Sequence, residues 1–160
     1  MQQLDREIVE NLLRSRWATL ACTNADGTAL ASQVAIAWVP GTSALVMHLS
    51  TLAKHTRNLL ERPHAALSIS ELDDARDDPQ TLARISIDGT VAVVARESID
   101  YQATQRRYLE RLPLAAPRFD FGDFNLFSLA VNSAQYVGGF ARAFRISPHE
   151  LSQISTTGHE

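Results

Sequence analysis

The sequence predicts a mainly β protein, a β-rich α+β fold in which six or seven strands form an antiparallel barrel with a few short peripheral helices. Strand-like stretches follow one another along most of the chain, and residues typical of tight turns join most consecutive pairs. A doubly wound sheet would instead need a helix after nearly every strand. The sequence shows no repeat, low-complexity stretch or linker. Residues 1–160 are therefore expected to form one domain, with an N-terminal helix at about 5–15 and the barrel at about 17–146.

Composition narrows the class of protein. The 160 residues are 45% hydrophobic and 21% charged, which is typical of a globular chain with a sizeable core. The net charge of −3 supplies no basic field for nucleic acid or an anionic membrane surface, and no apolar stretch is long enough to cross a bilayer. Residues 1–15 mix acidic and apolar side chains, unlike a signal peptide, and Cys22 is the single cysteine. We therefore expect a cytoplasmic protein that binds neither nucleic acid nor membranes.

The first half of the chain changes from helical to strand periodicity. Apolar residues recur at helical spacing from Leu4 onward, and Asp5 is expected to cap that helix. From Trp17 the pattern becomes strand-like, with turn residues at 24–27 and 40–43. The first three strands are expected at 17–23, 30–39 and 44–49.

The second half alternates strands with short helices. A helix is expected at 51–61, ending before Pro63, and an acidic surface loop at 71–80. Gly89 marks either a bulge or a tight turn within a long strand, and Ser147 begins a capping box. The remaining strands are expected at 65–70, 82–95, 124–131 and 134–146, and a second helix at 98–112.

The helix start at 50–59 is the stretch with the clearest chemical pattern. Lys54, His55 and Arg57 crowd its first turns, although cations are unfavourable near a helix N-terminus. A bound phosphate would reverse that penalty, because free backbone N–H groups at a helix start attract anions. Three hydroxyls could add donors: those of Ser50, Thr51 and Thr56. The alternative is a solvated helix whose hydroxyl group only caps the backbone.

This stretch also carries a resemblance. Residues 49–59, LSTLAKHTRNL, resemble the LSxLAxHTxNL run of the pyridoxamine 5′-phosphate oxidase-like flavoproteins, and in particular their haem-utilisation branch. Three further stretches agree in order and spacing: PHAAL at 63–67, DP followed by ARISIDG within 78–89, and FGDFNL followed by VGGFARA within 121–143. The resemblance covers about residues 16–146.

The resemblance implies a split β-barrel homodimer with FMN held at the subunit interface. Matching position by position implies that the FMN-phosphate segment consists of Ser50, Thr51, Lys54, His55 and Thr56. It implies that the strand beside the isoalloxazine, which relatives use mainly through its backbone, holds Ser32, Gln33, Val34 and Ala35. Arg84 falls where relatives place a polar residue near the flavin.

Two departures from the family argue against a true pyridoxamine phosphate oxidase. Such enzymes carry an arginine and a lysine on the second strand, where residues 33–38 have no basic side chain here. They also end with a tryptophan and an Arg-x-His segment, neither of which follows position 140. The resemblance thus implies an FMN-dependent oxidoreductase acting on a small-molecule redox substrate. The alternatives are a haem-binding or haem-degrading protein and a non-catalytic FMN carrier. The sequence identifies no catalytic acid or base.

Other polar residues receive simpler interpretations. Four aspartates, at 73, 74, 77 and 78, fit no calcium-loop spacing and are expected on a solvated loop. His48, His64, His149 and His159 show no metal-ligand spacing, so no metal site is expected. The phenylalanines at 119, 121, 124 and 127 are expected to fill the core or a dimer interface.

Overall fold

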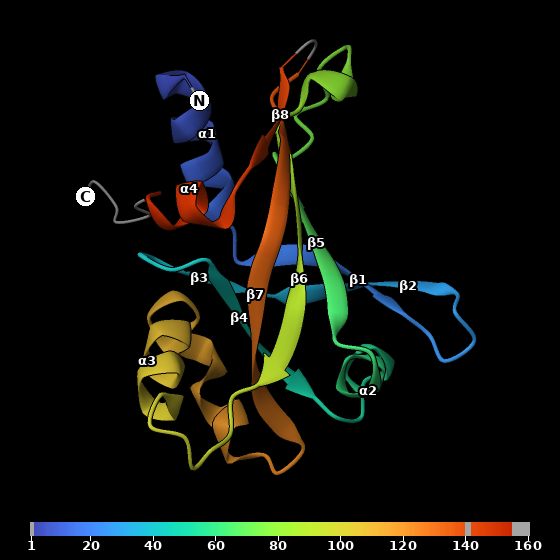
Figure 1. Cartoon of the computed structure of the whole chain (residues 1–160), viewed down its shortest axis with the longest axis vertical. Helices are drawn as coiled ribbons and strands as arrows, with labels where there is room; N and C mark the ends of the chain where they lie inside the picture. The colour runs from blue at the N-terminus through green and yellow to red at the C-terminus, as the bar shows by residue number, and fades with distance from the viewer. Residues whose placement is uncertain (1, 140–141, 155–160) are drawn as a thin grey trace.

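The computed structural model describes residues 2–139 and 142–154, and within them one antiparallel sheet curls into a half-barrel (Figure 1). The sheet order is β2-β1-β5-β6-β7-β4-β3, and β8 pairs with β7 off this path. The strands are β1 (Trp17–Thr23), β2 (Ala29–Ala35), β3 (Ala37–Val39), β4 (Ala44–Ser50), β5 (His64–Ser70), β6 (Arg84–Val93), β7 (Phe124–Val137) and β8 (Ala143–Ile146). This architecture confirms the β-rich α+β prediction and matches a split β-barrel.

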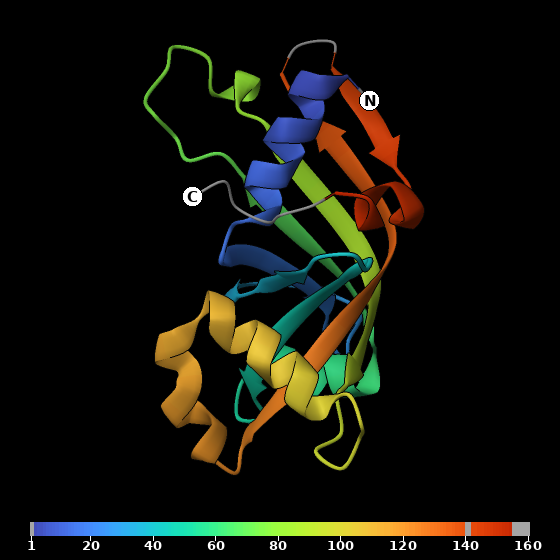
Figure 2. The same ribbon diagram turned by 90° about the vertical axis from the view of Figure 1, so that its left-hand side faces the viewer.

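Short helices cover the two ends of the long strands. The α-helices are α1 (Gln3–Leu13), α2 (Lys54–Glu61), α3 (Tyr101–Arg111) and α4 (Pro148–Ser152), and the 3₁₀ helices are η1 (Pro79–Thr81) and η2 (Pro113–Asp120). Helices α1 and α4 lie at one end of β6 and β7, whereas α2, α3 and η2 lie at the other (Figure 2). Within the described residues, no helix is long and apolar enough to span a membrane.

Strand β4 is buried on both faces. Leu45, Met47 and Leu49 point into the main barrel core, because alternate residues of a strand face the same side. Val46 and His48 point to the opposite side, where α3 and η2 cover them with a second apolar cluster. The α3–η2 segment therefore gives β4 a second buried face.

Three expectations for the first half of the chain are wrong. Asp5 does not cap α1, which begins after Gln2; its side chain is buried and accepts a hydrogen bond from Arg142. Helix α2 begins at Lys54 rather than at 51, because Ala53 remains extended, with ψ of 139°. The expected strand at 30–39 is two strands, β2 and β3, which brings the total among the described residues to eight.

The expected break between the strands at 124–131 and 134–146 is also wrong. Strand β7 runs without a break, and its pairing with β6 skips Asn132, since Asp88 pairs with Ser133 and Gly89 with Val131. Gly89 thus lies at a bulge, the first of the two alternatives that the sequence left open. A Cβ there would lie 2.4 Å from the Ala130 carbonyl oxygen, so the close strand approach requires glycine. The predicted capping box is confirmed: Ser147 Oγ accepts from the Glu150 N–H at 3.2 Å.

Candidate functional site

The junction between β4 and α2 holds the predicted phosphate segment. The N–H groups of residues 54–56 have no hydrogen-bond partner within the described part of the chain, and Ala53 offers no side-chain cap. No acidic residue lies in the first turn of α2. The Thr56 hydroxyl is fully buried and, among the described residues, likewise lacks a partner. Free donors and a positive helix end could bind an anion here.

One hydroxyl of this segment is already engaged. Ser50 Oγ donates a short hydrogen bond to the Asp123 carboxylate and accepts one from the Leu52 N–H at 3.1 Å. The Thr51 N–H donates to the Asp123 backbone carbonyl at 2.8 Å. Sequence reasoning missed Asp123 as a site residue, although it lies in the FGDF stretch that carries the resemblance.

The basic residues of the junction differ in availability. Lys54 is exposed near the β1–β2 turn, where hydrogen bonds from Thr28 and, to a lesser extent, the Lys54 charge lower the pKa of Asp26. The Arg57 guanidinium donates to the Leu52 carbonyl at 2.5 Å. Burial lowers the pKa of His55, so its imidazole is neutral at neutral pH. Lys54 is therefore the side-chain cation that is most available to a ligand.

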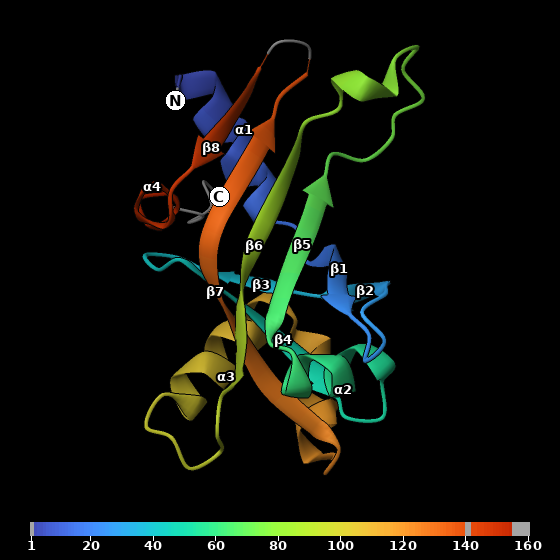
Figure 3. The same cartoon turned by 45° about the vertical axis from the view of Figure 1, so that its right-hand side comes forward.

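Residues Ser32 to Ala35 lie on β2, which is an edge strand of the sheet. Within the described residues β2 pairs only with β1, so its other edge leaves backbone groups free. Val34 faces the core, whereas Gln33 is exposed and donates to Thr19 Oγ1 at 2.7 Å. Helix α2 contacts the turn end of this hairpin, where Asn58 Nδ2 donates to Asn24 Oδ1 at 2.9 Å (Figure 3). Residues 32–35 lie farther along β2.

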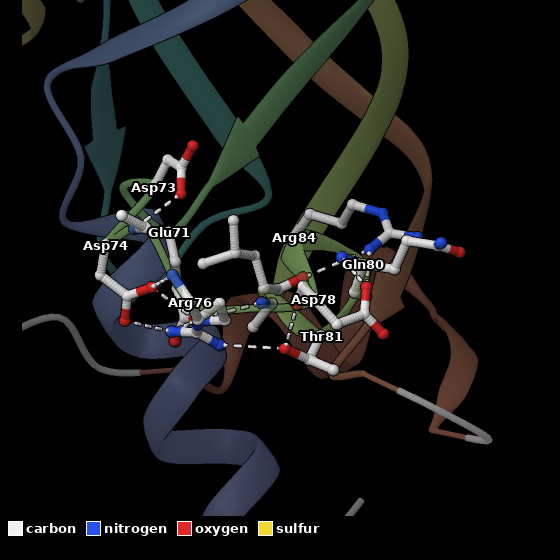
Figure 4. Close-up of polar contacts among 11 residues, drawn as sticks. Glu71, Asp73, Asp74, Arg76, Asp78, Gln80, Thr81 and Arg84 are labelled. Atoms are coloured by element: carbon white, nitrogen blue, oxygen red, sulfur yellow. Dashed lines mark hydrogen bonds and ion pairs between the residues drawn. The ribbon is translucent and has the colours of Figure 1, made fainter.

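Arg84 lies away from α2 within one chain. Helix α2 leads into β5 at His64, which pairs with Thr90, whereas Arg84 pairs with Ser70 at the opposite end of β6. Its guanidinium donates to the Gln80 and Leu82 carbonyls, both at 3.3 Å (Figure 4). The structure therefore brings Ser50, Thr51, Lys54, His55 and Thr56 together, but not Arg84.

The acidic loop beside Arg84 is organised by Arg76. The Arg76 Nε atom lies 2.8 Å from Asp74 Oδ1, and the hydrogen bonds from this guanidinium lower the pKa of Asp74 to about 2 (Figure 4). Asp73 accepts from the Ala75 N–H at 2.9 Å, and Asp78 caps η1. No group of three or more metal-ligating side chains occurs in residues 2–139 or 142–154.

A second polar feature lies beneath η2. His48 is 6% exposed, and neither ring nitrogen has a hydrogen-bond partner in the described part of the chain. Its ring stacks on Phe119 with centroids 3.8 Å apart and also contacts Tyr108 and Phe124. Burial, assisted by the charges of Arg118 and Arg96, lowers the pKa of His48 to about 4. The imidazole is therefore neutral at neutral pH.

These features define the class of protein first. The antiparallel half-barrel, with a helix start rich in donors after β4, is that of a split-barrel protein. The chain belongs to the pyridoxamine 5′-phosphate oxidase family, whose model matches residues 4–138.

Several proteins that are similar to this chain have names that mention haem. The non-canonical haem oxygenase HOZ of Arabidopsis thaliana chloroplasts is 35% identical over 100 residues, which are 62% of this chain and 29% of that protein. A haem-binding protein from Mycobacterium smegmatis has a TM-score of 0.82 at 25% identity, covering 95% of this chain and 61% of that chain. HutZ, the haem storage protein from Vibrio cholerae, has a TM-score of 0.71 over 93% of this chain and 99% of its own. At 21% identity, HutZ shows the fold alone. The chain thus spans less than two thirds of the first two relatives.

Proposed function

We propose that this chain is a haem-binding protein of the pyridoxamine 5′-phosphate oxidase family. The observation that carries the proposal is its 35% identity over 100 residues with a haem oxygenase. The haem-binding protein from M. smegmatis, at 25% identity, supports it. Haem degradation is the further activity that the oxygenase relative suggests.

The residues of this chain offer what haem would need. Iron binds neutral imidazole, and both ring nitrogens of His48 are buried without a hydrogen-bond partner among the described residues. Burial also lowers the pKa of both His48 and His55, which favours the neutral ring. Exposed arginines at 96 and 118 lie close enough to His48 to influence its charge and could pair with haem carboxylates. When bound, haem would supply a redox-active iron; the chain would supply its ligand and its carboxylate partners.

Haem titration tests the proposal. We expect a saturable Soret band with the wild-type chain. His48→Phe, which keeps an aromatic ring beside Phe119, or His55→Ala should lose it or shift it. His64→Ala is the matched control, because His64 is exposed on β5. A wild-type protein that yields only the spectrum of free haem would refute the proposal.

The second candidate is the function that the sequence predicted, an FMN-binding flavoprotein acting as an oxidoreductase. The free N–H groups of residues 54–56, together with the Lys54 side-chain cation, favour FMN binding, because such groups can bind a phosphate. Flavin fluorescence quenching distinguishes the two functions: an FMN protein should bind FMN at least about tenfold more tightly than riboflavin. Equal affinity for both would exclude this segment as a phosphate site.

We further infer that the working form is a cytoplasmic homodimer. The separation of Arg84 from α2 within one chain supports a site built from two copies, in which Arg84 of one copy would approach α2 of the other. The single, buried Cys22 is consistent with a reducing compartment.

A further inference from the structure

Asp123 contacts the β4–α2 junction from a segment far away in the sequence. It lies between η2 and β7, 73 positions from Ser50, and holds the junction through two hydrogen bonds. Its carboxylate accepts the Ser50 hydroxyl, and its backbone carbonyl accepts the Thr51 N–H at 2.8 Å. The turn that leads into α2 therefore has an acidic side chain built into it.

This contact changes what the junction can offer to a phosphate. A hydroxyl has one hydrogen to donate, and Ser50 gives it to Asp123. The Asp123 carboxylate also has no ion-pair partner within the described residues, so its charge is not neutralised locally. A phosphate monoester carries about −1.5 to −2 charges at neutral pH and would be repelled by a carboxylate close by.

We propose that Asp123 is a specificity-determining residue that selects against phosphate monoesters at the β4–α2 junction. Residues 54–56 keep the free N–H donors of a phosphate site. The Asp123 carboxylate, however, engages the Ser50 hydroxyl and adds a negative charge beside these donors. The inference uses FMN only as a phosphate-bearing probe and does not require that the wild-type chain bind FMN.

Asp123→Asn tests this directly, because the amide oxygen can still accept the Ser50 hydroxyl while the charge is removed. We expect the dissociation constant of FMN, measured by fluorescence quenching, to fall at least about fivefold. The dissociation constant of riboflavin, which lacks the phosphate, should stay within about twofold. Asp120→Asn is the matched control, since Asp120 is exposed in the same segment and should alter neither constant.

Two further variants keep the test decisive. Ser50→Ala removes the hydroxyl but leaves the carboxylate, so it should not strengthen FMN binding. Asp123→Ser replaces Asp123→Asn if the latter unfolds, and should strengthen FMN binding likewise. An FMN affinity that is unchanged or weaker after removal of the charge overturns the proposal, whether or not the wild type binds flavin detectably.

Haem titration of the same proteins separates this inference from the proposed function. If the wild type shows no Soret band with haem, haem binding is refuted. If Asp123→Asn also binds FMN more tightly than the wild type, the role of Asp123 is supported. If the wild type binds haem and Asp123→Asn does not bind FMN more tightly, haem binding is supported and the role of Asp123 is refuted.

Discussion

At the residue scale, His48 shows how burial can couple protonation to stability. The groups that face it are Tyr108 from α3, Phe119 and Arg118 from η2, Phe124 from β7, and Arg96 from the segment after β6. None of these supplies a negative charge, and both arginines oppose a second cation. The native state therefore favours the neutral ring, with a pKa of about 4 against 6.5 for the free side chain.

This difference predicts a loss of stability in acid. The folded pKa is depressed, so the unfolded chain binds the proton first as the pH falls from 6.5 toward about 4. We expect His48 to cost about 2 to 3 kcal/mol of unfolding free energy between pH 7.5 and pH 4.5. Denaturant unfolding at both pH values measures it. Between the same pH values, the loss of unfolding free energy in His48→Phe should be smaller than in the wild type by about 2 to 3 kcal/mol. An equal loss in both proteins would contradict the buried, neutral state of His48.

Lys54 and His55 allow a second test at this scale. Replacing both with alanine removes the available cation and one half-buried imidazole from the start of α2. If the junction binds FMN, its affinity should fall at least about tenfold, which is about 1.4 kcal/mol. The melting temperature should change little, because helix starts tolerate alanine. Fluorescence quenching compares the double variant with Arg62→Ala at the other end of α2. Unchanged affinity would place the phosphate elsewhere.

At the element scale, the bulge between β6 and β7 lets a 14-residue strand follow the curvature of the half-barrel. The extra residue, Asn132, lies opposite the Asp88–Gly89 step. The neighbouring backbone approaches Gly89 so closely that no side chain fits. The curvature and the glycine therefore depend on each other.

Gly89→Ala should be strongly destabilising. The added methyl would lie 2.4 Å from the Ala130 carbonyl oxygen and 2.5 Å from a Leu129 methyl carbon, so backbone and core must both shift. We expect a loss of at least about 2 kcal/mol in unfolding free energy. Gly122→Ala is the control, because nothing lies within 4 Å of its added Cβ. Similar stabilities for the two variants would contradict the packing at the bulge.

At the scale of the whole molecule, the outer face of the sheet carries a row of small residues. Ala31, Ala21 and Ala66 lie side by side on β2, β1 and β5, since Ala21 pairs with both of the others. A depression of about 360 Å³ beside Ala21 and Ala66 is also lined by Asp88 and Asn132. Such a smooth face would allow close approach of a second copy.

Light scattering at micromolar concentration tests this arrangement. We expect the wild type to have twice the chain mass of 17.6 kDa. Ala21→Arg would bury a charge in the centre of the row and should yield monomers, because an unpaired buried charge is costly. Gln102→Arg on the exposed side of α3 should leave the dimer intact. A wild-type mass of 17.6 kDa would refute the dimer.

Much of the fold could be predicted because its causes are local. Alternating side chains identified the β1, β5 and β6 regions, and Ser147 with Glu150 identified the capping box. The α2 segment was recognisable as a helix start, but its first residue was not. Ala53 is extended, and the two residues that precede Leu52, Ser50 and Thr51, are hydrogen-bonded to the distant Asp123.

The sequence by itself therefore determined the fold class, the irregularity at Gly89 and the segment with free N–H groups. These depend on residue spacing over one strand or one helical turn, where side-chain direction follows from backbone geometry. The tertiary structure alone decided that Asp5 binds Arg142, that His48 is buried without a partner, that Arg84 lies far from α2, and that Asp123 engages Ser50. Each of these depends on how the barrel closes and brings distant segments together, which no local pattern in the sequence specifies.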